Sequence, residues 1–127
     1  MGVWIRRIAR LASLPCRVLA GVCTLAAMPC FGAVDFVTEV QPVLTAKCLG
    51  CHAGASAQAG LRLHTRADLL TGGASGAAIV PGKSAESLLV KRISGQQGLR
   101  MPPVGPPLDE RTIAIIRAWI DEGAKYD

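Results

Sequence analysis

Two cysteines and a histidine stand together in the segment Cys48-Leu49-Gly50-Cys51-His52. Two intervening residues let the chain turn so that both sulfurs face the same edge of one flat group, and the histidine follows directly. This spacing is the attachment signature of a c-type haem, whose vinyl groups react with the thiols and whose iron takes the imidazole as an axial ligand. The motif therefore predicts one covalently attached haem c, with Cys48 and Cys51 as its anchors and His52 as an iron ligand.

Two other chemistries use a Cys-x-x-Cys pair. A thiol–disulfide redox site belongs in a thioredoxin-like βαβ context, and the sequence shows no such alternation of strands and helices. A closed zinc site needs four ligands, and the sequence offers no second cysteine pair of this kind. Covalent haem is the interpretation that we prefer, and these two remain alternatives.

The residue on the other side of the iron decides what the haem does. Met101 is the only methionine after the first 33 residues, and it lies 49 positions beyond His52. Pro102 and Pro103 fix φ and stiffen its loop, so that the thioether can be held against the iron, where it raises the reduction potential. His64 is the alternative sixth ligand and would give a bis-histidine haem of lower potential. An open sixth position is the third option.

The helices that must position these groups are visible in the hydropathy pattern. Over residues 35–47 the apolar positions have the spacing of a helix with one buried face, which Asp35 can cap and which Pro42 should kink or restart. The cysteine motif follows this helix directly. Residues 110–122 show the same periodicity, with Asp109 as the cap. These two helices are expected to be the main elements of the fold.

The middle of the chain is less regular. Ser84 resembles a helix N-cap with a short helix behind it to about Ser94, and residues 67–70 favour one helical turn. Residues 95–108 hold four prolines and three glycines, which excludes a regular element. The fold is therefore predicted to be all-α, with the N- and C-terminal helices packed beside one covalent haem and Trp119 near the porphyrin.

The first 33 residues have the three parts of a secretory signal peptide. Arginines stand near the start, an uncharged apolar run covers residues 18–28, and small residues follow, with cleavage predicted within about 30–33. The cytochrome-like domain would then occupy residues 34–127 and be exported to the periplasm. An uncleaved membrane anchor and lipid attachment at Cys23 or Cys30 are the alternatives, and membrane association is expected only if the N-terminal segment is uncleaved.

The charge balance gives no sign of a nucleic-acid partner once this segment is set aside. The whole chain has 14 basic and 9 acidic residues, but four arginines lie within the first 17 positions, which leaves 10 basic against 9 acidic. Two haem propionates would bring this formal +1 to about −1. The excess of basic residues therefore reflects the export signal, and redox proteins are the expected partners.

With these residues assembled, the mature chain resembles the planctomycete-type cytochrome c domain, a branch of the class I cytochrome c fold. The resemblance covers nearly all of residues 36–124. It rests on the haem motif, on Met101-Pro102-Pro103 and Trp119-Ile120, and on shorter matches at Phe36, Val40, Pro42, Leu44, Gly60-Leu61-Arg62-Leu63, Leu70, Gly72-Gly73, Gly76, Val80-Pro81-Gly82, Ser87-Leu88-Leu89 and Gly123-Ala124. It implies that Cys48 and Cys51 bind haem and that His52 and Met101 ligate iron. The family commonly has an acidic residue where this chain has His64, which keeps the bis-histidine alternative open.

The expected function is single-electron transfer by a periplasmic monohaem c-type cytochrome, and not catalysis. With both axial positions filled, the iron has no free position for a substrate. The ligands then move little when the iron gains or loses an electron. Two alternatives remain. One is a haem subunit of a larger periplasmic oxidoreductase complex, and the other is a ligand-binding or peroxidase-like protein whose sixth ligand is labile.

Overall fold

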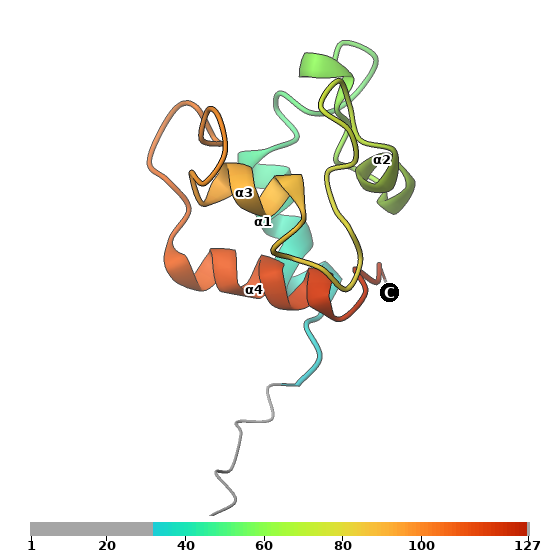
Figure 1. Cartoon of the computed structure of the whole chain (residues 1–127), viewed down its shortest axis with the longest axis vertical. Helices are drawn as coiled ribbons and strands as arrows, with labels where there is room; N and C mark the ends of the chain where they lie inside the picture. The colour runs from blue at the N-terminus through green and yellow to red at the C-terminus, as the bar shows by residue number, and fades with distance from the viewer. Residues whose placement is uncertain (1–31, 127) are drawn as a thin grey trace, which may run out of the picture. The chain divides into compact units, whose positions relative to one another are not determined.

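The computed structural model describes residues 32–126 of the 127-residue chain, so the predicted signal peptide lies almost entirely outside the described residues. This part of the chain forms helices and contains no strand, as the all-α prediction requires (Figure 1). No helix in it is long and apolar enough to cross a membrane. The elements are η1 (Phe36–Val40), α1 (Gln41–Lys47), η2 (Gln58–Gly60), α2 (Arg66–Thr71), α3 (Leu88–Ile93) and α4 (Glu110–Asp121).

The first helix begins at the predicted residue. The Asp35 carboxylate accepts the Thr38 backbone N–H at 2.8 Å, and this bond holds the pKa of Asp35 below its ordinary value. The chain then runs through the π-helical turn η1 and restarts as α1. Pro42 lies in the first turn of α1, where a missing N–H leaves no bond unmade. The expected restart at Pro42 is confirmed.

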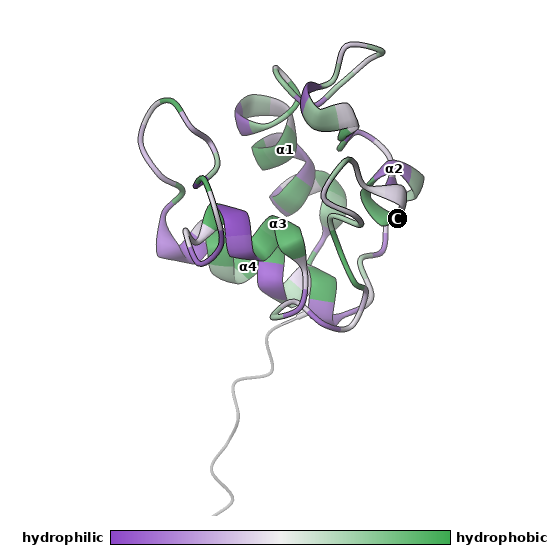
Figure 2. Cartoon of the chain, turned by 45° about the horizontal axis from the view of Figure 1, so that its top comes forward, coloured by the Kyte–Doolittle hydropathy of each residue, from purple (hydrophilic) through white to green (hydrophobic). Residues whose placement is uncertain are grey.

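The last helix, α4, is fixed at both ends. The Asp109 carboxylate accepts the Thr112 backbone N–H at 2.9 Å, and beyond the other end Arg66 Nε donates to the Ala124 carbonyl at 2.8 Å. The ribbon of α4 alternates between apolar and polar residues (Figure 2), as expected for a helix with one buried face. Its buried residues are Ile113, Ile116, Trp119 and Ile120.

Three aromatic rings hold the first and last helices together. The Phe36 ring centroid lies 5.4 Å from that of Trp119 and 3.8 Å from that of Tyr126, onto which it stacks. Trp119 is 1% exposed, and its indole N–H donates to the Lys125 carbonyl at 2.6 Å. The predicted packing of the N-terminal helix against the C-terminal helix is thus confirmed.

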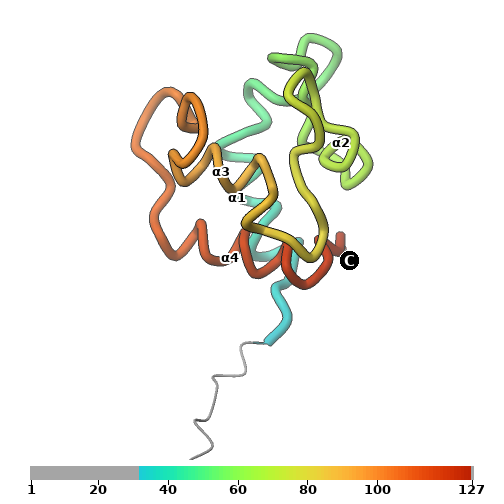
Figure 3. The backbone as a smooth tube through the Cα atoms, in the orientation of Figure 1, coloured from blue at the N-terminus to red at the C-terminus, as the bar shows by residue number. Residues whose placement is uncertain are grey.

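The helix predicted from Ser84 begins four residues later, because Ser84 makes a different bond. Its backbone N–H and its hydroxyl both donate to the Asp121 carboxylate of α4, at 2.7 and 2.8 Å. Figure 3 shows the chain after α2 running down to the end of α4, where the Gly82 N–H donates to the Ile120 carbonyl at 2.7 Å, before it turns back into α3. Ser84 thus joins this segment to α4 and does not cap α3.

Candidate cofactor site

The cysteine motif leaves the end of α1 as a hydrogen-bonded turn. The Cys48 N–H donates to the Leu44 carbonyl at 2.9 Å, and the N–H groups of Cys51 and His52 both donate to the Cys48 carbonyl, at 3.1 and 3.0 Å. The cysteines are not bonded to each other. Cys48 is half-buried, and this burial raises the pKa of its thiol to about 11, whereas Cys51 is exposed. The turn brings both thiols and the imidazole to one place.

His52 is anchored to the segment that follows the motif. The carbonyl of His52 accepts the Leu63 N–H at 2.9 Å, and its ring Nδ1 lies 3.2 Å from the Leu61 carbonyl oxygen. A carbonyl oxygen only accepts, so Nδ1 carries a proton, which leaves Nε2 as the ring nitrogen that can bind a metal. This is the arrangement of a metal-binding histidine.

A cavity of about 320 Å³ opens beside the motif. Its walls come from the motif, from residues 58–63, from the glycine-rich turn after α2, from α3 and from the proline-rich loop. Most of the side chains are small or apolar, as in sites that bury a flat organic group. The residues around it are Lys47, Cys48, Cys51, His52, Gln58, Ala59, Leu61, Leu63, Gly73, Ala74, Ser75, Gly76, Ala78, Leu88, Leu89, Arg92, Ile93, Met101, Pro102, Pro103 and Val104.

One wall of the cavity consists of two stretches of main chain in direct contact. The Ala74 N–H donates to the Ala59 carbonyl at 2.9 Å. A Cβ atom at Gly73 would lie only 2.6 Å from that same carbonyl oxygen, so a side chain there would push the two stretches apart. Their close approach has no local sequence pattern beyond the two adjacent glycines.

Met101 reaches the cavity from the proline-rich loop. It is half-buried and lines the cavity together with Cys48, Cys51 and His52, although 49 residues separate it from His52. Its backbone N–H donates to the Arg92 carbonyl near the end of α3 at 3.0 Å. The donors that the sequence singles out therefore meet: two thiols, an imidazole and a thioether surround one apolar space.

His64 does not line this cavity. Its ring Nε2 lies 3.6 Å from Oδ2 of Asp68, and Arg62 Nε donates to Oδ1 of the same carboxylate at 2.9 Å. Bonds from the Thr65 hydroxyl and from Arg62 hold the pKa of Asp68 below its ordinary value. His64 thus lies in a polar cluster at the start of α2.

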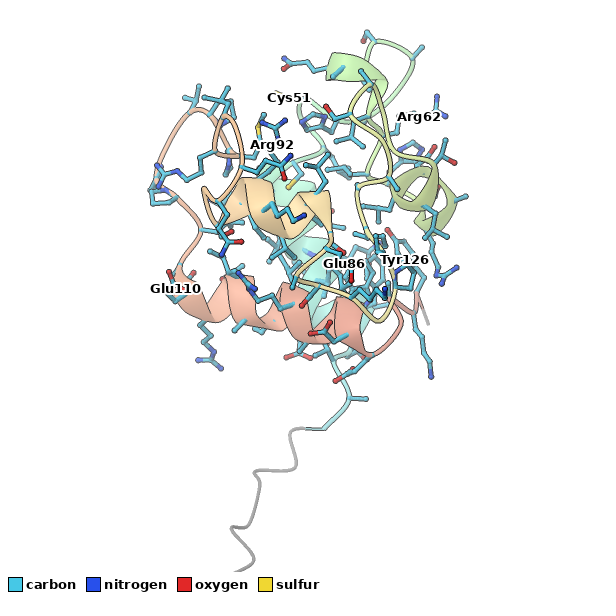
Figure 4. The ribbon with its side chains drawn as sticks, in the orientation of Figure 1. Cys51, Arg62, Glu86, Arg92, Glu110 and Tyr126 are labelled. Carbon is cyan, nitrogen blue, oxygen red and sulfur yellow. The ribbon has the colours of Figure 1, made fainter. Side chains whose placement is uncertain are left out.

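Trp119 does not line the cavity and packs with Phe36 and Tyr126. Phe36 and Trp119 belong to the same buried core as Leu63, Leu89 and Ile93 of the cavity wall. That Trp119 lies near a bound porphyrin stays a prediction. The two charged residues that line the cavity are both basic, Lys47 and Arg92. Figure 4 shows Arg92 and Cys51 near each other above α3, whereas Glu110 lies away from both, at the start of α4.

These residues suit a haem. The thiols are the groups that form thioethers, Nε2 of His52 is available to a metal, and Met101 offers a soft sulfur. The two cations suit the carboxylates that a haem carries. Within residues 32–126 no group of three or more His, Cys, Asp or Glu side chains is placed so that it could hold a metal ion by itself. The donor set is thus one of thiols, one imidazole and one thioether.

Residues 48–105 match the family model of the Planctomycete cytochrome C. The chain carries a planctomycete-type cytochrome c domain. The match extends from the first cysteine of the motif to the loop beyond Met101, and it confirms the resemblance predicted from the sequence. A cytochrome c domain binds haem c covalently and transfers electrons. No curated protein and no solved structure matches the chain.

Proposed function

We propose that this cytochrome domain carries one haem, attached at Cys48 and Cys51, and passes single electrons with His52 and Met101 as axial ligands. One observation carries the proposal. Four donor side chains from two distant segments line the same apolar cavity, and the chemistry of each is that of a haem anchor or an iron ligand. The bound haem supplies the Fe(III)/Fe(II) couple, and the chain holds the ligands in place.

The two ligands are held by main-chain bonds that do not depend on the oxidation state. The Leu61 carbonyl fixes the ring of His52, and the Arg92 carbonyl fixes the backbone of Met101. Ligands that stay in place when the charge on iron changes make the reorganisation energy small, which suits a carrier. Met101 is favoured over His64 as the sixth ligand because Met101 lines the cavity, whereas His64 faces Asp68.

We propose that the protein functions in the periplasm. Haem is attached to exported chains outside the cytoplasm, and the first 33 residues have the pattern of an export signal. The donor and the acceptor are proposed to be other redox proteins, with no nucleic acid involved.

The test of the sixth ligand is a pair of matched substitutions, Met101→Ala and His64→Ala, in protein matured in a host that attaches haem. Ferric wild type should show the weak far-red band of methionine-bound haem. Met101→Ala should abolish it and lower the reduction potential by on the order of 0.1 V, within the range of about 0.8 V that axial ligands span. His64→Ala should change neither.

Carbon monoxide separates the carrier from the alternatives. Ferrous wild type should bind it poorly without denaturant, and Met101→Ala should bind it readily, because removal of the thioether opens a coordination position. A wild type that binds carbon monoxide at once and lacks the far-red band would contradict the proposal and favour a ligand-binding or peroxidase-like haem.

A further inference from the structure

The loop that carries Met101 folds back over the end of α3. The last carbonyls of a helix have no partner within the helix and must be satisfied from outside. Here the Arg92 carbonyl accepts two N–H groups of the loop, that of Gly95 at 3.2 Å and that of Met101 at 3.0 Å. The main chain of Arg92 is thus one attachment point of the loop on α3.

The side chain of Arg92 makes a second attachment two to three residues before Met101, at Leu99 and Gly98. Its Nη1 donates to the Leu99 carbonyl at 3.5 Å, a long bond, and the guanidinium lies directly against Gly98. A Cβ atom at Gly98 would overlap Nη1. Among the described residues no carboxylate forms an ion pair with Arg92. The guanidinium therefore contacts the loop and the cavity and is not held by an acidic residue.

We propose that Arg92 is a positioning residue for Met101. Its guanidinium holds residues 98–99 against α3, and this contact keeps the thioether turned into the cavity. The inference rests on the proposed ligation of iron by Met101. When the contact is lost, the loop spends more time displaced from α3. The apparent affinity of the Met101 thioether for iron then falls in proportion to the fraction of time that the loop is in place.

Four variants separate this role from charge and from backbone strain. Arg92→Gln removes the charge and the fork of donors, whereas Arg92→Lys keeps the charge but lacks the planar fork. Gly98→Ala keeps Arg92 and displaces its guanidinium by steric overlap. Gly105→Ala is the matched control, since Gly105 has φ +85° against +62° at Gly98, lies in the same loop and has open space around its Cβ position.

The readout is the affinity of the ferric haem protein for added imidazole, which competes with the thioether for iron, together with the far-red band. Arg92→Gln, Arg92→Lys and Gly98→Ala should each bind imidazole roughly three- to tenfold more tightly than wild type, as expected for loss of one modest contact. Their far-red bands should weaken accordingly. Gly105→Ala should match wild type in both measurements.

Three results would overturn the inference while the proposed function stands. The first is a set of variants that all bind imidazole as wild type does, although the wild type shows its far-red band. The second is Arg92→Lys equal to wild type with Arg92→Gln altered, which would assign the effect to charge. The third is equal effects of Gly98→Ala and Gly105→Ala, which would assign it to backbone strain. A wild type without the band would instead overturn the ligation by Met101.

Discussion

Replacing Tyr126 by phenylalanine should stabilise the protein, although it removes a polar group from a packed cluster. The Tyr126 hydroxyl oxygen is buried and has no hydrogen-bond partner among residues 32–126, while its ring stacks on Phe36 with the centroids 3.8 Å apart. Burial of an unpaired hydroxyl costs about 1–3 kcal/mol relative to an apolar atom in its place. Tyr126→Phe keeps the ring, so we expect a gain of about 1 kcal/mol in the free energy of unfolding at neutral pH.

The same substitution should change the response to alkali. Burial raises the pKa of Tyr126 from 10.0 to about 12, with a smaller contribution from the charge of Asp68. A group whose pKa is raised by folding stabilises the fold below its unfolded pKa, and this stabilisation is lost as the pH rises from 10 toward 12. The full difference between the folded and unfolded pKa of Tyr126 would correspond to at most about 2.7 kcal/mol in the free energy of unfolding. Partial exposure of the ring reduces this contribution to about 1 kcal/mol.

Thermal unfolding of the ferric haem protein, followed by Trp119 fluorescence, measures both effects. The gain at neutral pH should appear as a rise in melting temperature of about 4–8 °C. The difference in melting temperature between Tyr126→Phe and wild type should then increase above pH 10. Phe36→Leu is the control and should destabilise at every pH, because it removes a ring of the same cluster. A Tyr126→Phe variant that is less stable than wild type would refute the reasoning, since the hydroxyl would then be making a favourable bond.

Two further substitutions test the cavity wall and the last helix. Gly73→Ala should cost about 1–3 kcal/mol in the free energy of unfolding, because its Cβ would press on the Ala59 carbonyl. Gly50→Ala is the control and should cost far less, because its Cβ would meet no atom within 4 Å. Equal costs of the two substitutions would contradict the close approach at Gly73. Asp109→Ala should lower the melting temperature at neutral pH. The Thr112 N–H holds the pKa of Asp109 below 3.8, so this difference should shrink as the pH falls below that value, and a constant difference would argue against the cap.

Helix positions and donor residues could be predicted from the sequence because both leave local patterns. Asp35 and Asp109 cap the predicted helices, and the irregular loop lies between α3 and α4 as its prolines and glycines require. Helix caps and proline positions act over a few residues, so a short window of sequence contains the whole signal. The family match adds that the cysteine motif and the loop with Met101 belong to one domain.

The features that could not be predicted all depend on contacts between distant segments. Ser84 has the sequence context of a cap, but the carboxylate of Asp121, 37 residues away, offers it two bonds. The ring of Trp119 packs in tilted contacts against Phe36, from the other end of the domain, and against Tyr126, and no local pattern marks these contacts. The acceptor for the His52 ring is a main-chain carbonyl, which every residue has, so no residue type marks it.

Main-chain anchoring of both proposed ligands has a consequence for which positions tolerate change. The Leu61 carbonyl would accept the same bond whatever side chain that residue carried, whereas the Arg92 side chain also contacts the loop through the Leu99 carbonyl. An added side chain matters most where a second backbone or a guanidinium lies against the chain, as it does at Gly72, Gly73 and Gly98. The geometry of the site should therefore be most sensitive to a single added methyl group at these three glycines, and less sensitive to larger changes along the exposed parts of the same loops.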